Sequence, residues 1–182
     1  DLYFAITPND NTLIYIEKGL SNHFEAFVQF QGLPLRAVIK AGRFIPNFGW
    51  RFPDHKSFVR DVTGFSQYPT KGTPLIEDNG VEIGFFPMAA EFSLGITNGS
   101  TSAGPDGDRG KAVTARSAVR FSLFNLDFTL GGNYRYDQIG LPDPQQRFAG
   151  GFWGIAAGKF VFIGESDWII KDGITGIAST QN

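Results

Sequence analysis

The chain has 182 residues, the length of a single domain that can bury a substantial core. Charged residues make up 19%, whereas glycine (23) and phenylalanine (19) are frequent, which leaves few helix-forming stretches and favours an all-β fold. The net charge of −2 gives no reason to expect nucleic acid or an anionic membrane surface as a partner, and the absence of cysteine excludes disulfides, thiolate metal sites and cysteine nucleophiles.

Strand-like segments follow one another along the whole chain and are separated by turn residues such as Pro8, Asn9 and Asp10. Most connections are short, which suits antiparallel neighbours, and residues 99–111 form a longer, glycine-rich connection. No linker divides the chain, so we expect one domain over residues 1–182, with a long loop at about 45–79. The predicted strands are 2–7, 12–18, 24–31, 35–44, 81–86, 90–98, 112–124, 126–137, 147–157, 160–170 and 174–178.

Apolar and polar residues alternate along these segments, as in residues 90–97, where Phe92 and Leu94 alternate with Glu91 and Ser93. Successive side chains of a strand point to opposite faces, so each segment has one apolar and one polar face. This repeated pattern is typical of a transmembrane β-barrel, with its apolar face toward lipid and its polar face toward a watery lumen. The sequence therefore predicts an all-β antiparallel meander barrel of about ten strands, either complete or part of a larger barrel.

The polar faces define a set of residues that we expect to line the lumen. Their charges are of mixed sign, which suits cross-strand ion pairs and water. By the same alternation we expect Phe121 and Phe128 on the lipid side, and the only charge found on the apolar faces is Arg43, next to a strand end. The predicted lumen-lining residues are Arg36, Lys40, Glu82, Glu91, Arg116, Arg120, Asp127, Arg135, Lys159, Glu165 and Asp167.

A water-soluble barrel or sandwich produces the same alternation, with the apolar face as its core. Two features favour the membrane. Aromatic residues such as Trp50, Tyr136 and Trp168 recur near strand ends, as in interfacial girdles. Glycine and alanine are frequent on the apolar face, which is a poor choice for a densely packed core. In residues 147–157 both faces are rich in glycine, and Gly150, Gly151 and Gly154 indicate a place where a loop or neighbouring strand approaches closely.

The regular spacing of strands stops between residues 43 and 80, and a long connection inside a compact domain is usually functional. We expect this loop to fold inward or to lie at the rim. Its polar residues either constrict a pore and attract anions or hold the loop in place through arginine–carboxylate pairs, and we favour the second role. This loop constellation consists of Arg43, Arg51, Asp54, His55 and Arg60.

The same segment resembles a group of poorly characterised bacterial outer-membrane porin-like proteins. Their pattern is a strand ending in Ala-Gly-Arg-Phe, a Pro-x-Phe-Gly-x-Arg turn and an Asp-His with a downstream arginine. The resemblance implies a location in the bacterial outer membrane and a barrel with more strands than this chain supplies. The matching residues are Ala41, Gly42, Arg43, Phe44, Pro46, Phe48, Gly49, Arg51, Asp54, His55 and Arg60.

Some members of that group accompany multihaem cytochromes, which implies a partner role in electron export. This chain has no Cys-x-x-Cys-His, so we expect no covalent haem and no other cofactor. It begins without a signal peptide and ends without the usual terminal aromatic residue, from which we expect a fragment of a longer protein.

Three functions follow, and none of them is enzymatic, because no nucleophile–base pair or metal-ligand set stands out. The first is a passive outer-membrane channel for small hydrophilic solutes, with lipid around it. The second is a non-conducting barrel that sheathes or scaffolds a partner such as a multihaem cytochrome or another outer-membrane subunit. The third is a soluble ligand-binding β-barrel.

Overall fold

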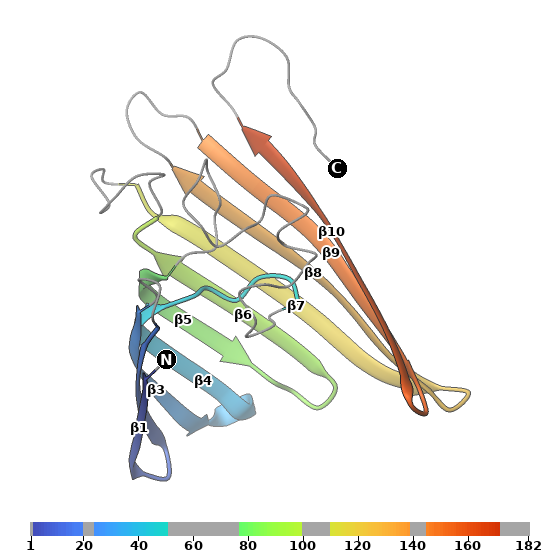
Figure 1. Cartoon of the computed structure of the whole chain (residues 1–182), viewed down its shortest axis with the longest axis horizontal. Helices are drawn as coiled ribbons and strands as arrows, with labels where there is room; N and C mark the ends of the chain where they lie inside the picture. Colours follow the sequence, from blue (N-terminus) through green and yellow to red (C-terminus); the bar gives the residue numbers. More distant parts are fainter. Residues whose placement is uncertain (1, 20–23, 51–76, 100–109, 139–144, 172–182) are drawn as a thin grey trace.

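The structure is a computed structural model, and it describes residues 2–19, 24–50, 77–99, 110–138 and 145–171. These residues form a single sheet of ten strands (Figure 1). They include no α-helix, and hence no helix long and apolar enough to cross a membrane. The strands are β1 (Leu2–Asn9), β2 (Thr12–Lys18), β3 (Phe24–Leu33), β4 (Ala37–Phe44), β5 (Asp78–Phe85), β6 (Ala90–Thr97), β7 (Ala112–Leu123), β8 (Leu126–Gln138), β9 (Gln145–Ala157) and β10 (Phe160–Lys171).

The sheet is an antiparallel meander in which each strand pairs with its neighbours in sequence, from β1 to β10. In the part of the chain that the structure describes, β1 and β10 do not pair with each other, so the sheet is open, as expected for part of a barrel. The predicted all-β meander is therefore confirmed, and each predicted boundary of these ten strands lies within three residues of the observed one. The predicted strand 174–178 lies outside the described residues.

Tight hairpins join the long strands β7 to β8 and β9 to β10. Phe124 and Asn125 have φ of 51° and 60°, and Gly158 has φ of 59°. Left-handed turn residues match the twist of the flanking strands and so fix the register of a hairpin. In the first hairpin, Phe121 pairs with Phe128, and their stacked rings have centroids 5.2 Å apart.

The start of β4 differs from the prediction. A 3-10 turn over Pro34–Arg36 precedes the strand, and Leu35 and Arg36 have φ of 59° and 53°. Pro34 has no N–H to donate to the ladder, and left-handed residues cannot continue an extended strand. The strand therefore begins at Ala37, and Arg36 lies in the turn and not beside Lys40 on a strand face, which corrects the prediction for Arg36.

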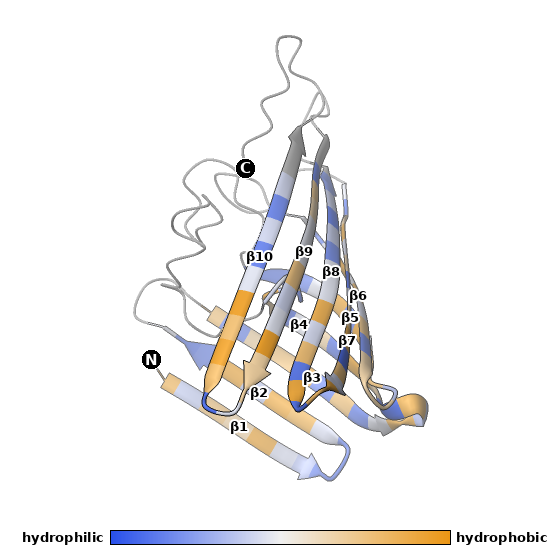
Figure 2. Cartoon of the chain, turned by 90° about the vertical axis from the view of Figure 1, so that its right-hand side faces the viewer, coloured by the Kyte–Doolittle hydropathy of each residue, from blue (hydrophilic) through white to orange (hydrophobic). Residues whose placement is uncertain are grey.

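Hydrophilic and hydrophobic residues alternate along many of the strands (Figure 2), and the two faces that they form differ in exposure. Phe92, Leu94 and Phe121 are 50%, 47% and 42% exposed. On the other face, Glu82 is 8% and Arg135 is 1% exposed. The apolar face is thus the uncovered one, the reverse of the arrangement in a soluble sheet protein.

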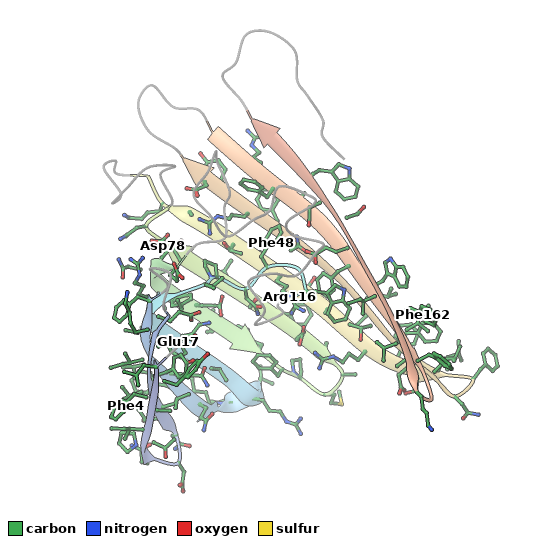
Figure 3. The ribbon with its side chains drawn as sticks, in the orientation of Figure 1. Phe4, Glu17, Phe48, Asp78, Arg116 and Phe162 are labelled. Atoms are coloured by element: carbon green, nitrogen blue, oxygen red, sulfur yellow. The ribbon has the colours of Figure 1, made fainter. Side chains whose placement is uncertain are left out.

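The sheet is curved, and the polar residues line its concave side. Figure 3 shows Phe48 and Arg116 within the curve, whereas Phe4 and Phe162 project away from it. After β4 the chain does not turn directly into β5. Residues 45–50, which we call the strap, run across the concave face instead (Figure 1). The rest of the predicted loop up to residue 76 lies outside the described residues.

Candidate functional site

The concave face and the strap together form the candidate site. Charged side chains that would be costly to bury singly are held there in pairs. Lys40 Nζ lies 2.9 Å from Glu82 Oε1 across β4 and β5, and both side chains are about one tenth exposed or less. The buried polar residues that the structure describes are Glu17, Glu25, Lys40, Asp78, Glu82, Glu91, Thr97, Thr114, Asn133, Arg135 and Asp137.

Two carboxylates hold the strap through its backbone. Glu82 on β5 accepts a hydrogen bond from the Asn47 N–H at 2.9 Å. Glu165 on β10 accepts one from the Trp50 N–H at 3.1 Å. These contacts lie on opposite sides of the concave face, so the strap crosses it from β5 to β10, five strands away. Hydrogen bonds to charged acceptors are the stronger kind, each contributing about 1.5–3 kcal/mol.

Arg116 on β7 holds the middle of the strap. Its Nε donates to the Gly49 carbonyl at 2.9 Å, and a terminal nitrogen of the same guanidinium pairs with Glu91. Its guanidinium carbon also lies 4.6 Å from the centre of the Phe152 ring. Glu91 has a second partner, Arg120, at 2.9 Å, whose side chain is 64% exposed. One arginine therefore anchors the strap, and the other faces open space.

The strap ends on a surface built from glycine and aromatic residues. Trp50 Nε1 donates to the carbonyl oxygens of Trp153 (3.3 Å) and Gly164 (3.2 Å). Its ring rests over Gly154, where an added Cβ would lie 3.0 Å from the ring, and it meets Phe152 edge-on at 5.2 Å. The expectation that Gly154 allows close approach of a loop is confirmed.

Phenylalanine rings are buried on the concave side. Phe44, Phe148 and Phe152 point to that side by the strand registers, and Phe48 belongs to the strap. Phe44 and Phe148 are fully buried, and Phe48 and Phe152 are each 2% exposed. Trp50 of the strap meets the Phe152 ring. Gly131 makes room for Phe152, because an added Cβ would collide with its ring. The strap is therefore packed against the wall and not only tethered to it.

A second polar network lies on β7, β8 and β10. Arg135 donates to Asp137 at 2.9 Å and to Thr114 Oγ1 at 3.2 Å, and all three residues are buried. Asn133 donates to Asp167 at 3.3 Å. The Arg135–Asp137 pair is buried and supports the wall of the sheet, whereas Asp167 is only half-buried.

Beside the strap there is a cavity of about 140 Å³, lined in part by Lys40, Asn47 and Ser93. A water molecule needs roughly 10–15 Å³ of such space, so several waters fit. The Asn47 side chain donates to Ser93 Oγ at 3.2 Å along this cavity. The strap therefore leaves polar, hydrated space on the side of β3 to β6.

Nine of the eleven predicted lumen-lining residues point to the concave face by the strand registers. Arg120 and Asp127 lie on that face near the turns, where both are exposed. Lys159, like Arg36, is in a turn, because β9 ends at Ala157 and β10 starts at Phe160. These two cations lie at the rim, which corrects their predicted position.

Of the loop constellation, the structure describes Arg43, whose Nε donates to the Phe24 carbonyl at 3.1 Å across β3 and β4. The other four members, Arg51, Asp54, His55 and Arg60, lie outside the described residues. The sequence placed Glu82, Arg116 and Glu165 on the lumen face but did not predict that they hold the strap. A sequence signal for this role was present, because Glu82 and Glu165 lie on strand faces with glycine-rich neighbours that leave room for a loop.

No protein-family model, curated protein or solved structure matches this chain. The resemblance to outer-membrane porin-like proteins therefore stays an expectation. Within the described ranges, no group of three or more His, Cys, Asp or Glu side chains is placed to hold a metal ion.

Proposed function

We propose that this chain forms part of the wall of a β-barrel in the bacterial outer membrane, and that small hydrophilic solutes diffuse through the polar interior of that barrel. One observation carries the proposal: the apolar face is the exposed one, and the ionic face is enclosed by the curve of the sheet and by the strap. In water the apolar face would remain largely exposed to solvent. In a bilayer it would contact the hydrocarbon chains of lipids.

The dimensions of the long strands support this proposal. On β7, apolar residues on the outer face run from Val113 to Leu123, ten residue steps, or roughly 34 Å along the strand. A strand tilt of about 40° reduces this to roughly 26 Å along the barrel axis, close to the apolar band of about 25 Å in outer-membrane barrels. β8 repeats the span in the opposite direction.

The strap gives the proposed passage its narrow part. It crosses the interior from Glu82 to Glu165, and hydrated space remains beside it. Charges facing such a constriction set ion preference through the local potential. Arg120 is an exposed cation beside the strap's central anchor, since it shares Glu91 with Arg116.

The test is conductance of the full chain in a planar lipid bilayer. We expect ohmic channels, and Arg120→Glu should move the reversal potential in a salt gradient toward cations. Arg116→Glu should do the same and also raise conductance, because it releases the strap. The matched control is Arg36→Glu, which makes the same charge change in an exposed turn. A chain that stays soluble without detergent, or inserts and carries no current, contradicts the channel.

The buried rings on the concave side favour a second candidate, a non-conducting barrel that scaffolds a partner. Phe44, Phe48 and Phe148 occupy interior space that an open pore would leave to water. Insertion without current, together with co-purification of a haem protein detected by its absorbance, would select this function over the first.

A further inference from the structure

The outer face is apolar over most of its area, and its charged residues gather at one rim. Among strand residues with described side chains, those that are charged and point outward are Lys18, Arg43 and Arg147, and all are basic. The prediction that Arg43 is the only charge on this face is therefore wrong, because the registers add Lys18 and Arg147. Lys111 continues the same face one residue before β7, where its Nζ donates to Asn98 Oδ1 at 3.1 Å. We call these four residues the basic rim.

The register places all four residues at the same end of the sheet. Lys18 is the last residue of β2, and Arg43 is the last but one of β4. Arg147 pairs with Tyr136 near the end of β8. The even-numbered strands of a meander run in one direction, and β7 starts where β6 ends. The basic rim therefore borders the edge from which the longer connections leave.

The outer face changes from apolar to polar over a single step at this rim. Arg43 pairs with Asn79, and the next outward-facing pair toward the middle of the sheet is Ala41 with Val81. Tyr134 and Trp168, which both pair with Ala149, are 43% and 46% exposed and lie one step inside Arg147. Aromatic rings followed by cations are typical of the boundary between hydrocarbon and headgroups.

Among the described residues near this rim, one carboxylate follows the outer face. Glu77 lies one residue before β5 and two before Asn79, which pairs with Arg43, so it continues the outer face as Lys111 does. Asp78 faces the concave side, where it accepts hydrogen bonds from the Asn79 and Gly99 N–H groups. The basic rim thus has four cations beside one carboxylate. At the opposite rim, the described turns carry Asp10 as well as Arg36 and Lys159, so the positive excess is larger at the basic rim.

We propose that the basic rim binds the phosphate groups of anionic lipids at one surface of the membrane. The inference rests on the proposed function in one respect, that the apolar face is inserted in lipid. Lipid phosphates lie at the level where the hydrocarbon ends, which is where the outer face changes from apolar to basic. Near an anionic surface each lysine or arginine favours binding by about fivefold.

The test uses vesicles of equal parts phosphatidylcholine and phosphatidylglycerol, with one lipid brominated at a time. Bromine quenches the outward-facing Trp153 and Trp168, so the ratio of the two quenching curves reports which lipid surrounds the protein. We expect enrichment of phosphatidylglycerol. Arg147→Gln, one outward step from Trp168, should reduce that enrichment by roughly fivefold. The control is Lys159→Gln, which removes one cation at the opposite rim of the same two strands and should change it little.

High salt gives an independent readout, because screening shortens the Debye length from about 10 Å at 0.1 M to about 3 Å at 1 M. The enrichment should disappear in 1 M NaCl. Equal quenching by both lipids in the unaltered protein, or equal loss in the Arg147→Gln and Lys159→Gln variants, overturns the inference. Insertion itself is judged in pure phosphatidylcholine. Failure there refutes the proposed function, and success there with no lipid preference refutes only the basic rim.

Discussion

At the scale of single residues, glycine allows the strap to reach its anchors. Gly49 has a left-handed φ of 55°, and an added Cβ would collide with the Glu165 carboxylate. Gly158, in the β9–β10 turn, has nearly the same φ of 59°, and nothing lies within 4 Å of the position of its Cβ. The two glycines share a backbone conformation and differ in their surroundings.

We predict that Gly49→Ala and Gly158→Ala destabilise the protein by different amounts. Both place alanine in the left-handed region, which costs roughly 1–2 kcal/mol. Gly49→Ala also displaces Glu165 from the Trp50 N–H, a charged hydrogen bond contributing about 1.5–3 kcal/mol. The free energy of unfolding, measured by urea titration in lipid vesicles, should therefore fall by about 1.5 kcal/mol or more further for Gly49→Ala. Equal losses would contradict the role of Glu165 as an anchor.

Arg116 and Arg120 illustrate why residue type alone does not assign a role. Both pair with Glu91, and both were expected on the same face from sequence. Only Arg116 also reaches the strap, through the Gly49 carbonyl and the Phe152 ring. The distinction depends on where a segment 67 residues earlier in the chain lies, which strand periodicity does not contain.

At the scale of elements, the strap behaves as part of the wall because its three charged anchors, Glu82, Arg116 and Glu165, come from three separate strands. We predict that Arg116→Met loosens it and that Arg120→Met does not, although each variant leaves Glu91 with one arginine. Loss of the charged hydrogen bond to Gly49 should speed hydrogen exchange of the Asn47 and Trp50 amides by on the order of tenfold to a hundredfold.

The measurement is hydrogen–deuterium exchange followed by mass spectrometry of peptides that cover residues 45–50. Peptides from β5 and β6 are the internal reference, because their amides belong to the sheet ladder. Similar acceleration in both variants would show that Arg116 acts through Glu91 and not through the strap.

The strands themselves were readable from sequence. Alternation of the kind seen at Phe92 and Glu91 placed all ten strands and both of their faces, because the period of two is a property of extended backbone. The exceptions are turn residues. Arg36 and Lys159 follow the alternation by number, yet left-handed residues and tight hairpins end the strands beside them.

At the scale of the whole molecule, the function depends on whether the outer face lies in lipid or in water. We predict that Leu130→Arg lowers the free energy of unfolding in lipid vesicles by about 2–4 kcal/mol, because Leu130 pairs with Val119 near the middle of the apolar band of β7 and β8. The matched control is Leu123→Arg beside the β7–β8 turn, where the cost should fall to about 0–1 kcal/mol.

Leu130 and Leu123 are 48% and 50% exposed, so a protein in water would tolerate both substitutions within about 0.5 kcal/mol. A difference between the two variants that appears in vesicles supports insertion with β7 and β8 across the bilayer. Two equal and small effects would favour the soluble barrel.

Periodicity determined by itself that this chain is an all-β meander with one apolar and one ionic face, because neighbouring side chains of a strand must point in opposite directions. Only the tertiary structure decided that the apolar face is the exposed one and that the strap lies across the ionic face. Those features depend on contacts such as Trp50 with Glu165, 115 residues apart, and on the curvature of ten paired strands. Local sequence does not encode either, since both arise from packing between segments distant in the chain.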